Sequence, residues 1–231
     1  MVLRAYRDGD VLYKRKLNVG RTLDTPHLLT HRADFLGALA QEAVRLGVLI
    51  QFNSTVARID FSKPAIELLG HGEVEYDAIF GADGQKSFCR DTLLGYPDPP
   101  QLSGDLAYRI VIPVSEMDHD KELVGLLESF DISCWMGPHA HVVCYQLKEL
   151  FNVVLIAPDS SSVTLDGAKT DMQEIEAILS DWDAQLRRLF QLAKGVLKRR
   201  LWSSLEMTNW SHPNSTFALI GDACHVSTPH L

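Results

Sequence analysis

The sequence predicts a mixed α/β protein in which a domain built around a parallel sheet is interrupted by an inserted, mostly antiparallel β-sheet domain. An apolar strand-like run meets a glycine-aspartate loop and a helix start at residues 79–88, and the same pattern returns at residues 217–225. Between them, beyond the Pro/Gly-rich stretch "GYPDPPQLSG", lie four runs rich in β-forming residues. A chain that leaves a parallel sheet and later returns to it indicates an inserted domain.

The first eighty residues alternate between strand and helix patterns. "VLRAYRDGDVLYKRKL" predicts two strands around an Asp8-Gly9 turn. "HRADFLGALAQEAVRLG" predicts a helix, because its apolar residues recur at helical spacing and Gly47 follows as a stop. "VLIQF" predicts a short apolar strand, and "STVARIDFS" with "AIELLG" predicts a small antiparallel pair.

The remaining elements follow in the order that an insert requires. A strand predicted from Val74 to Phe80 breaks at the "GADG" loop of residues 81–84, and a helix resumes near Ser87. "LAYRIVIPV", "DISCWMG", "HVVCYQL" and "FNVVLIAP" predict an antiparallel sheet. "DMQEIEAILSDWDAQLRRLFQLA" predicts two helices that meet near Asp181 and Trp182, and "STFALIGDACH" predicts the last strand and a helix start.

Composition and charge exclude several classes of partner. The 231 residues are 46% hydrophobic, 23% charged and carry a net charge of −8, so we expect no nucleic-acid partner. No apolar run approaches the roughly 20 residues of a membrane span, and we expect no membrane partner. None of the four cysteines forms a C-x-x-C pair, which favours a reducing, cytoplasmic location. His139 and His141 have no carboxylate or cysteine at matching spacing, so we expect no metal site.

The two glycine-aspartate loops are the stretches best suited to chemistry. Glycine at a strand end lets the backbone approach a ligand, and the following helix N-terminus offers free N–H groups to an anion. A carboxylate such as Asp222 accepts hydrogen bonds from a polyol. The plain alternative for each loop is an ordinary strand-to-helix turn with an aspartate cap.

Taken together, these loops resemble the sequence fingerprints of a known family. "DAIFGADGQKSFCR" and "FALIGDACHVSTPH" resemble the DG and GD fingerprints of the FAD-dependent aromatic hydroxylases, the single-component monooxygenases of the p-hydroxybenzoate and salicylate hydroxylase type. "HRADFLGAL", "LAYRIVIP" and "HVVCYQLKELFNVVLIAP" are similar to further segments of that family, with Gln146 where proline is usual. The resemblance spans nearly the whole chain.

The resemblance implies a fold and a reaction. It implies a Rossmann-like FAD-binding domain at residues 1–100, a β-sheet substrate domain with helices at residues 101–205, and a return to the FAD-binding domain at residues 206–231. It also implies FAD as cofactor, NAD(P)H as co-substrate and O₂ as oxidant, with hydroxylation of a small aromatic substrate in secondary metabolism or aromatic degradation.

The resemblance also assigns roles to five residues. It implies that Arg32, Asp83, Gly221 and Asp222 bind the cofactor and that Arg109 is catalytic, on a strand that faces Gly221 and Asp222. A guanidinium there could hold a phenolate or carboxylate in its ionised form. The alternative for Arg32 and Arg109 is a surface position on the helix or strand.

One family motif is missing. No G-x-G-x-x-G occurs in the sequence, although the family carries that phosphate-binding turn on its first strand. The Rossmann-like domain is therefore expected to be incomplete, and the chain to be truncated at both ends. Two hypotheses follow: a partial FAD-dependent monooxygenase, or an inactive remnant without stable FAD binding that acts at most as a protein-interaction module. The substrate, the choice of hydroxylation over epoxidation or oxidative decarboxylation, the choice between NADH and NADPH, and the oligomeric state stay open.

Overall fold

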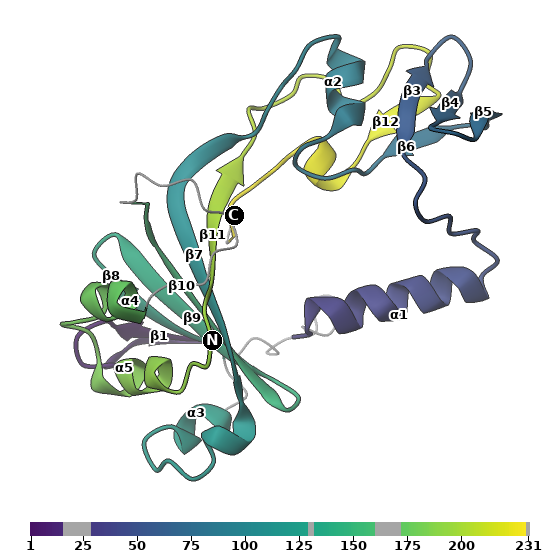
Figure 1. Cartoon of the computed structure of the whole chain (residues 1–231). Coiled ribbons are helices and arrows are strands. Elements are labelled where there is room, and N and C mark those ends of the chain that lie inside the picture. The colour runs from purple at the N-terminus through teal and green to yellow at the C-terminus, as the bar shows by residue number, and fades with distance from the viewer. Residues whose placement is uncertain (16–28, 129–131, 160–171, 230–231) are drawn as a thin grey trace. The chain divides into compact units, whose positions relative to one another are not determined.

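The computed structural model describes residues 1–15, 29–128, 132–159 and 172–229 (Figure 1). The chain divides into two compact units. Unit 1 comprises Met1–Glu42 and Gly104–Arg200, and unit 2 comprises Ala43–Ser103 and Leu201–Leu231. A helix, α1 (Arg32–Arg45), begins in unit 1 and ends in unit 2.

Unit 1 is built on a seven-stranded sheet with the strand order β11-β7-β10-β9-β8-β1-β2. Its strands are β1 (Val2–Ala5), β2 (Val11–Lys14), β7 (Gln101–Pro113), β8 (Ser133–Gly137), β9 (Ala140–Leu147), β10 (Leu150–Pro158) and β11 (Leu197–Ser203). The four predicted runs in the middle of the chain form β7 to β10, and the pairs β7–β10, β10–β9 and β9–β8 are antiparallel as expected.

The N-terminal hairpin forms as predicted but joins this sheet. β1 pairs with β2 antiparallel around the Asp8-Gly9 turn, and it pairs with β8 in parallel. Its first strand buries Val2, which is 4% exposed, against the inserted sheet. The hairpin therefore packs with the middle of the chain, a long-range pairing that its local pattern did not indicate.

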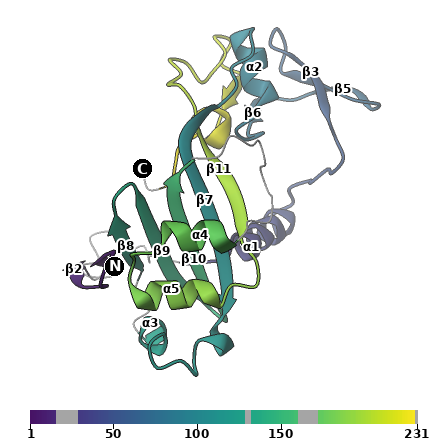
Figure 2. The same cartoon turned by 60° about the vertical axis from the view of Figure 1, so that its left-hand side comes forward.

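Helices cover one face of the seven-stranded sheet (Figure 2). They are α4 (Met172–Ile178) and α5 (Ala184–Gln191), and the predicted break near Asp181 and Trp182 lies between them. Two short elements, η1 (Val114–Glu116) and α3 (Val124–Glu128), follow β7. The core of unit 1 lies under the helices, because alternate side chains of β7, β9 and β10 point to that face; on β7 these are Leu106, Tyr108, Ile110 and Ile112.

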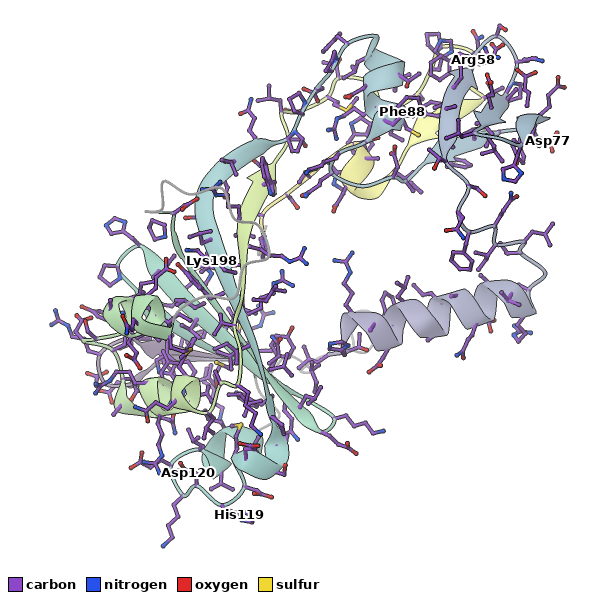
Figure 3. The ribbon with its side chains drawn as sticks, viewed as in Figure 1. Arg58, Asp77, Phe88, His119, Asp120 and Lys198 are labelled. Atoms are coloured by element: carbon purple, nitrogen blue, oxygen red, sulfur yellow. The ribbon has the colours of Figure 1, made fainter. Side chains whose placement is uncertain are left out.

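A polar cluster ties α4 to this face of the sheet. The hydroxyl of buried Tyr108 donates to Oε1 of Glu174 at 2.8 Å, and Nζ of Lys198 donates to both oxygens of that carboxylate at 2.8 and 2.9 Å (Lys198 is labelled in Figure 3). Burial and then the neighbouring Glu174 raise the pKa of Tyr108 above its ordinary value. The phenol therefore stays protonated and keeps donating throughout the physiological range.

The described residues of unit 2 include two small sheets and the short helix that follows β6. β3 (Val56–Asp60), β4 (Ala65–Leu68) and β5 (Gly72–Glu75) form an antiparallel sheet, while β6 (Ile79–Gly81) and β12 (Phe217–Leu219) pair in parallel. The helix is α2 (Phe88–Leu94), and the single turn η2 (Gly221–Ala223) follows β12. A small core gathers between them, made of Ile59, Cys89, Phe217, Leu219, Ala223 and Cys224.

Two sequence-based expectations in unit 2 are wrong. The strand expected from Val74 to Phe80 is divided into β5 and β6, which join different sheets. No strand forms at residues 48–52, where Leu49 is 97% and Phe52 80% exposed. An apolar run becomes a strand only where a partner strand satisfies its backbone, and in the described residues this run has none.

The helix α1 forms as predicted, yet it buries none of its residues. Its apolar stripe, which includes Phe35, Leu36 and Leu39, is at least half exposed. Among the described residues, no helix is both long and apolar enough to cross a membrane. The described part of the chain also contains no group of three His, Cys, Asp or Glu side chains placed to hold a metal ion.

Candidate functional site

The two glycine-aspartate loops leave neighbouring parallel strands at one edge of a sheet, as the sequence predicts. Leu219 of β12 is in register with Gly81 of β6, and the N–H of Ile220 donates to the carbonyl of Gly81 at 2.9 Å. After each of these strands the chain turns into a helical segment. α2 follows β6, and η2 follows β12. The carboxyl ends of parallel strands are the usual place for a ligand in an α/β sheet.

Asp83 caps the start of α2. Its carboxylate accepts hydrogen bonds from the Ser87 hydroxyl and from the Cys89 N–H at 3.0 Å, while Oγ of Ser87 accepts from the Arg90 N–H at 2.8 Å. Burial acts to raise the pKa of Asp83, but these hydrogen bonds outweigh it and lower the pKa. Asp83 therefore caps the helix, as the alternative interpretation of this loop expects. A contact between Asp83 and a cofactor stays a prediction.

Gly81 lets α2 approach the end of β6. A Cβ atom on Gly81 would lie 2.7 Å from Cβ of Cys89 and 2.9 Å from Cδ2 of Leu219. Both distances are shorter than real contacts between such atoms, and both neighbours are buried in the core of unit 2. The glycine is needed here for close packing of helix on strand.

Replacing Gly81 by alanine is therefore expected to destabilise unit 2 by about 1–3 kcal/mol, the typical cost of overpacking a core. Urea unfolding followed by amide hydrogen exchange of unit 2 measures this loss. The matched control is Gly37→Ala in α1, where a Cβ would meet nothing within 4 Å. There the change removes the helix penalty of glycine, and stability should hold or rise by up to about 1 kcal/mol. Equal stability of the two variants would contradict the close-packing role.

Gly221 and Asp222 present an open surface at the second loop. Gly221 has φ +59, in the left-handed region that favours glycine, and no atom lies within 4 Å of the position its Cβ would take. Both residues are exposed, and within the described part of the chain the Asp222 carboxylate accepts no hydrogen bond from the protein. An unpaired carboxylate beside an approachable backbone fits the hydroxyl groups of a polyol.

Arg90 holds the two loops together, and the sequence analysis assigned it no role. Its side chain is 1% exposed. Nη1 donates to the carbonyl of Ala223 at 3.2 Å, and Nη2 donates to the carbonyls of Gln85 at 2.9 Å and Asp98 at 2.7 Å. Nε also lies 3.3 Å from Oδ2 of Asp98. Because most of its partners are backbone carbonyls, no pattern of side chains in the sequence could reveal this role.

Arg109 lies on β7, which confirms that "AYR" is part of a strand. It is exposed on the face of the seven-stranded sheet opposite α4 and α5, because Tyr108 and Ile110 beside it point into the core. Among the described residues its guanidinium makes no ion pair. Its direction toward Asp222, and the catalytic role that depends on it, stay predictions.

Arg32 is the first residue of α1 and is exposed. Its side chain makes no hydrogen bond or ion pair within the described ranges. It is thus available to an anion, and its contact with the cofactor also stays a prediction.

Three further side chains share the face that carries Arg109, which we call the open face of the sheet. Asn152 of β10 is in register with Val111 of β7 on one side and with Tyr145 of β9 on the other. All three are at least partly exposed. The sequence left Tyr145 open between apolar surface of the substrate domain and core, because the face that a residue occupies depends on which strands become neighbours.

Comparison with known proteins identifies the family. The chain is 34% identical to the FAD-dependent monooxygenase OpS4 of Beauveria bassiana (strain ARSEF 2860) over 241 residues, which cover 100% of this chain and 56% of that protein. The chain belongs to the FAD-dependent monooxygenases. It is also 27% identical to 3-hydroxybenzoate 6-hydroxylase 2 of Aquipseudomonas alcaligenes, over 94% of this chain and 66% of the relative. No protein-family profile matches the sequence.

Solved structures share the fold of this chain. A substrate complex of salicylate hydroxylase superposes with a TM-score of 0.78 at 22% identity, covering 99% of this chain and 58% of that one. Klebsiella pneumoniae HpxO complexed with FAD and uric acid gives 0.82 at 18% identity, covering 99% and 57%. The chain therefore spans a little over half the length of these proteins, and the fold expected from the sequence is confirmed.

Proposed function

We propose that the protein is a FAD-dependent monooxygenase, or part of one, that uses NAD(P)H and O₂ to hydroxylate a small aromatic substrate. The register of Leu219 with Gly81 carries this proposal, because it brings both glycine-aspartate loops to the same strand ends. Family membership supports it, since the relatives named above include a 3-hydroxybenzoate hydroxylase and a FAD-dependent monooxygenase.

The predicted binding residues would contact different parts of the ligands. In unit 2, the Asp222 carboxylate would accept hydrogen bonds from the sugar-alcohol chain of FAD, and the Gly221 backbone would allow the cofactor to approach. The Asp83–Ser87 cap and the Arg90 contacts would keep both loops in place. In unit 1, Arg32 would pair with an anionic group of the cofactor and Arg109 with the ionised form of the substrate. The bound FAD supplies the oxygen-transfer chemistry, and the protein positions it.

The test is a titration of residues 1–231 with FAD, followed by flavin fluorescence and NAD(P)H consumption. We expect weak binding without measurable NAD(P)H consumption, because the sequence contains no G-x-G-x-x-G turn for the pyrophosphate. Asp222→Ala should weaken this binding by about tenfold to a hundredfold, since a hydrogen bond to a charged group contributes about 1.5–3 kcal/mol.

The matched control is Asp77→Ala, which removes another exposed carboxylate of unit 2 (labelled in Figure 3). This variant should bind FAD like the wild type. An Asp222→Ala variant that binds FAD as tightly as the wild type would contradict the assignment of this loop. So would a wild type that does not bind FAD at millimolar concentration. Submicromolar binding with turnover would show that the missing turn matters less than we expect.

One observation favours the alternative of a protein-interaction module. The apolar stripe of α1 and residues 48–52 are exposed, and exposed apolar surface of this extent is typical of protein contacts. A chain that binds no FAD but associates in sedimentation experiments, with association lost in Leu39→Glu, would favour this alternative.

A further inference from the structure

A cavity lies between α4 and α5, the two helices that cover one face of the seven-stranded sheet (Figure 2). Residues of α4, the two residues after it and residues of α5 line this cavity, which has a volume of about 310 Å³. That volume is near the lower end of the range for sites that hold small molecules. Arg109 lies on the opposite face of the sheet, so the cavity is separate from the substrate surface of the proposed function.

The floor of this cavity is apolar. Ile175, Leu179 and Phe190 line it and are each at most 3% exposed, and Met172 lines it beside them. Met172, Ile175 and Leu179 share one side of the helical segment because they are spaced three and four residues apart. A ligand would gain affinity here by removing an aliphatic group from water.

Two opposite charges stand at the rim of the cavity. Glu176 of α4 and Arg187 of α5 both line it, and both are exposed. Within the described ranges neither side chain forms a hydrogen bond or an ion pair, whereas the neighbouring Arg188 pairs with Asp120. An available carboxylate and an available guanidinium, one on each helix, are complementary to a ligand that carries one charge of each sign.

We propose that this cavity binds a free α-amino acid with a large aliphatic side chain. The side chain of the ligand would pack on the apolar floor, its ammonium group would pair with Glu176, and its carboxylate would accept hydrogen bonds from Arg187. The volume favours one amino acid over a helix of a partner protein, because a helix in a groove is anchored by side chains over several turns. The site goes beyond the proposed function and does not depend on it.

The experiment measures binding of L-leucine to residues 1–231 by calorimetry, without FAD or NAD(P)H. We expect a dissociation constant of about 1 mM or below, which is reasonable for so small a ligand. Glycine has both charges but no side chain, and it should not bind detectably at the same concentrations. Because leucine is aliphatic, it does not resemble the aromatic substrate of the proposed function, and failure of the FAD titration would leave this result unaffected.

Two analogues of leucine assign the two charges. Arg187→Gln should weaken binding of leucine, and of 4-methylpentanoate, which lacks the ammonium group, by about threefold to fivefold. The same variant should leave binding of 3-methylbutylamine, which lacks the carboxylate, unchanged. Glu176→Gln should give the reverse pattern, with weaker binding of leucine and of the amine and unchanged binding of the acid. Loss of packing alone would affect all three ligands equally.

The matched control is Arg188→Gln, which removes the neighbouring arginine of α5 that does not line the cavity. This variant should bind leucine like the wild type. All three substitutions replace exposed side chains, so the thermal midpoint should change little. No saturable binding of leucine up to roughly 10 mM would overturn the proposal. Leucine binding that is equally tight in the wild type, Arg187→Gln and Glu176→Gln would overturn it as well.

Discussion

Replacing Arg90 by methionine is expected to destabilise unit 2 by about 3–5 kcal/mol, enough to unfold a unit with so small a core. Methionine fills much of the volume but donates no hydrogen bond. The change would leave the Asp98 carboxylate and the carbonyls of Gln85 and Ala223 without the guanidinium that now pairs with them. Because Ala223 ends the turn that carries Asp222, FAD binding should be lost together with the fold of unit 2.

The measurement is amide hydrogen exchange resolved by unit. Unit 2 should lose protection in Arg90→Met while the seven-stranded sheet of unit 1 keeps it. The control is Arg58→Met. Arg58, labelled in Figure 3, forms ion pairs with Glu67 and Glu73. Its side chain is 53% exposed, so water screens those ion pairs and little stability should be lost. Similar protection in the two variants would show that the buried contacts of Arg90 do not hold unit 2 together.

The second large effect is expected in unit 1, where Asp183→Ala should cost about 2–4 kcal/mol. Asp183 is 8% exposed and begins α5 as its N-cap, accepting from the Gln185 N–H at 3.0 Å. It also accepts from Nε1 of the fully buried Trp135 at 2.8 Å. The substitution removes the cap, worth about 0.5–2 kcal/mol, and leaves a buried indole N–H unpaired, which costs about 1–3 kcal/mol.

Chemical unfolding followed by tryptophan fluorescence measures this loss, because Trp135 is buried in the core that unfolds. Asp181→Ala is the control, since this neighbouring aspartate is exposed and should change the unfolding midpoint little. A midpoint for Asp183→Ala that matches the control would mean that the cap and the indole hydrogen bond contribute nothing to unit 1.

Sequence patterns predicted the elements whose signals are local. Alternation in "LAYRIVIP" predicted β7, and the serine at Ser87 predicted the start of α2, which it caps. The Asp8-Gly9 pair predicted the first hairpin. These predictions are confirmed because strand alternation, helix caps and turn residues depend only on residues a few positions away in the sequence. The run at residues 48–52 failed for the opposite reason, since its strand needed a partner from elsewhere in the chain.

The candidate site was predictable only in part. The two glycine-aspartate loops could be located because their residue types and order are specific, and their meeting at one sheet edge followed from two strand-to-helix switches. The arginine that joins them could not be predicted, since Arg90 binds backbone carbonyls that every residue possesses. The neighbours of Asn152 could not be predicted either, because nothing in "FNVVLIAP" indicates which residues of β7 and β9 lie beside it.

The sequence by itself determined the family, the order of the elements and the glycine-aspartate loops, because these depend on residue types at short spacing along the chain. Only the tertiary structure decided that the N-terminal hairpin joins the inserted sheet, that Arg90 connects the ends of β6 and β12, and that Asn152 lies on the face with Arg109. The physical reason is that strand pairing and burial join residues far apart in sequence, and the free energy of such contacts depends on which partners meet.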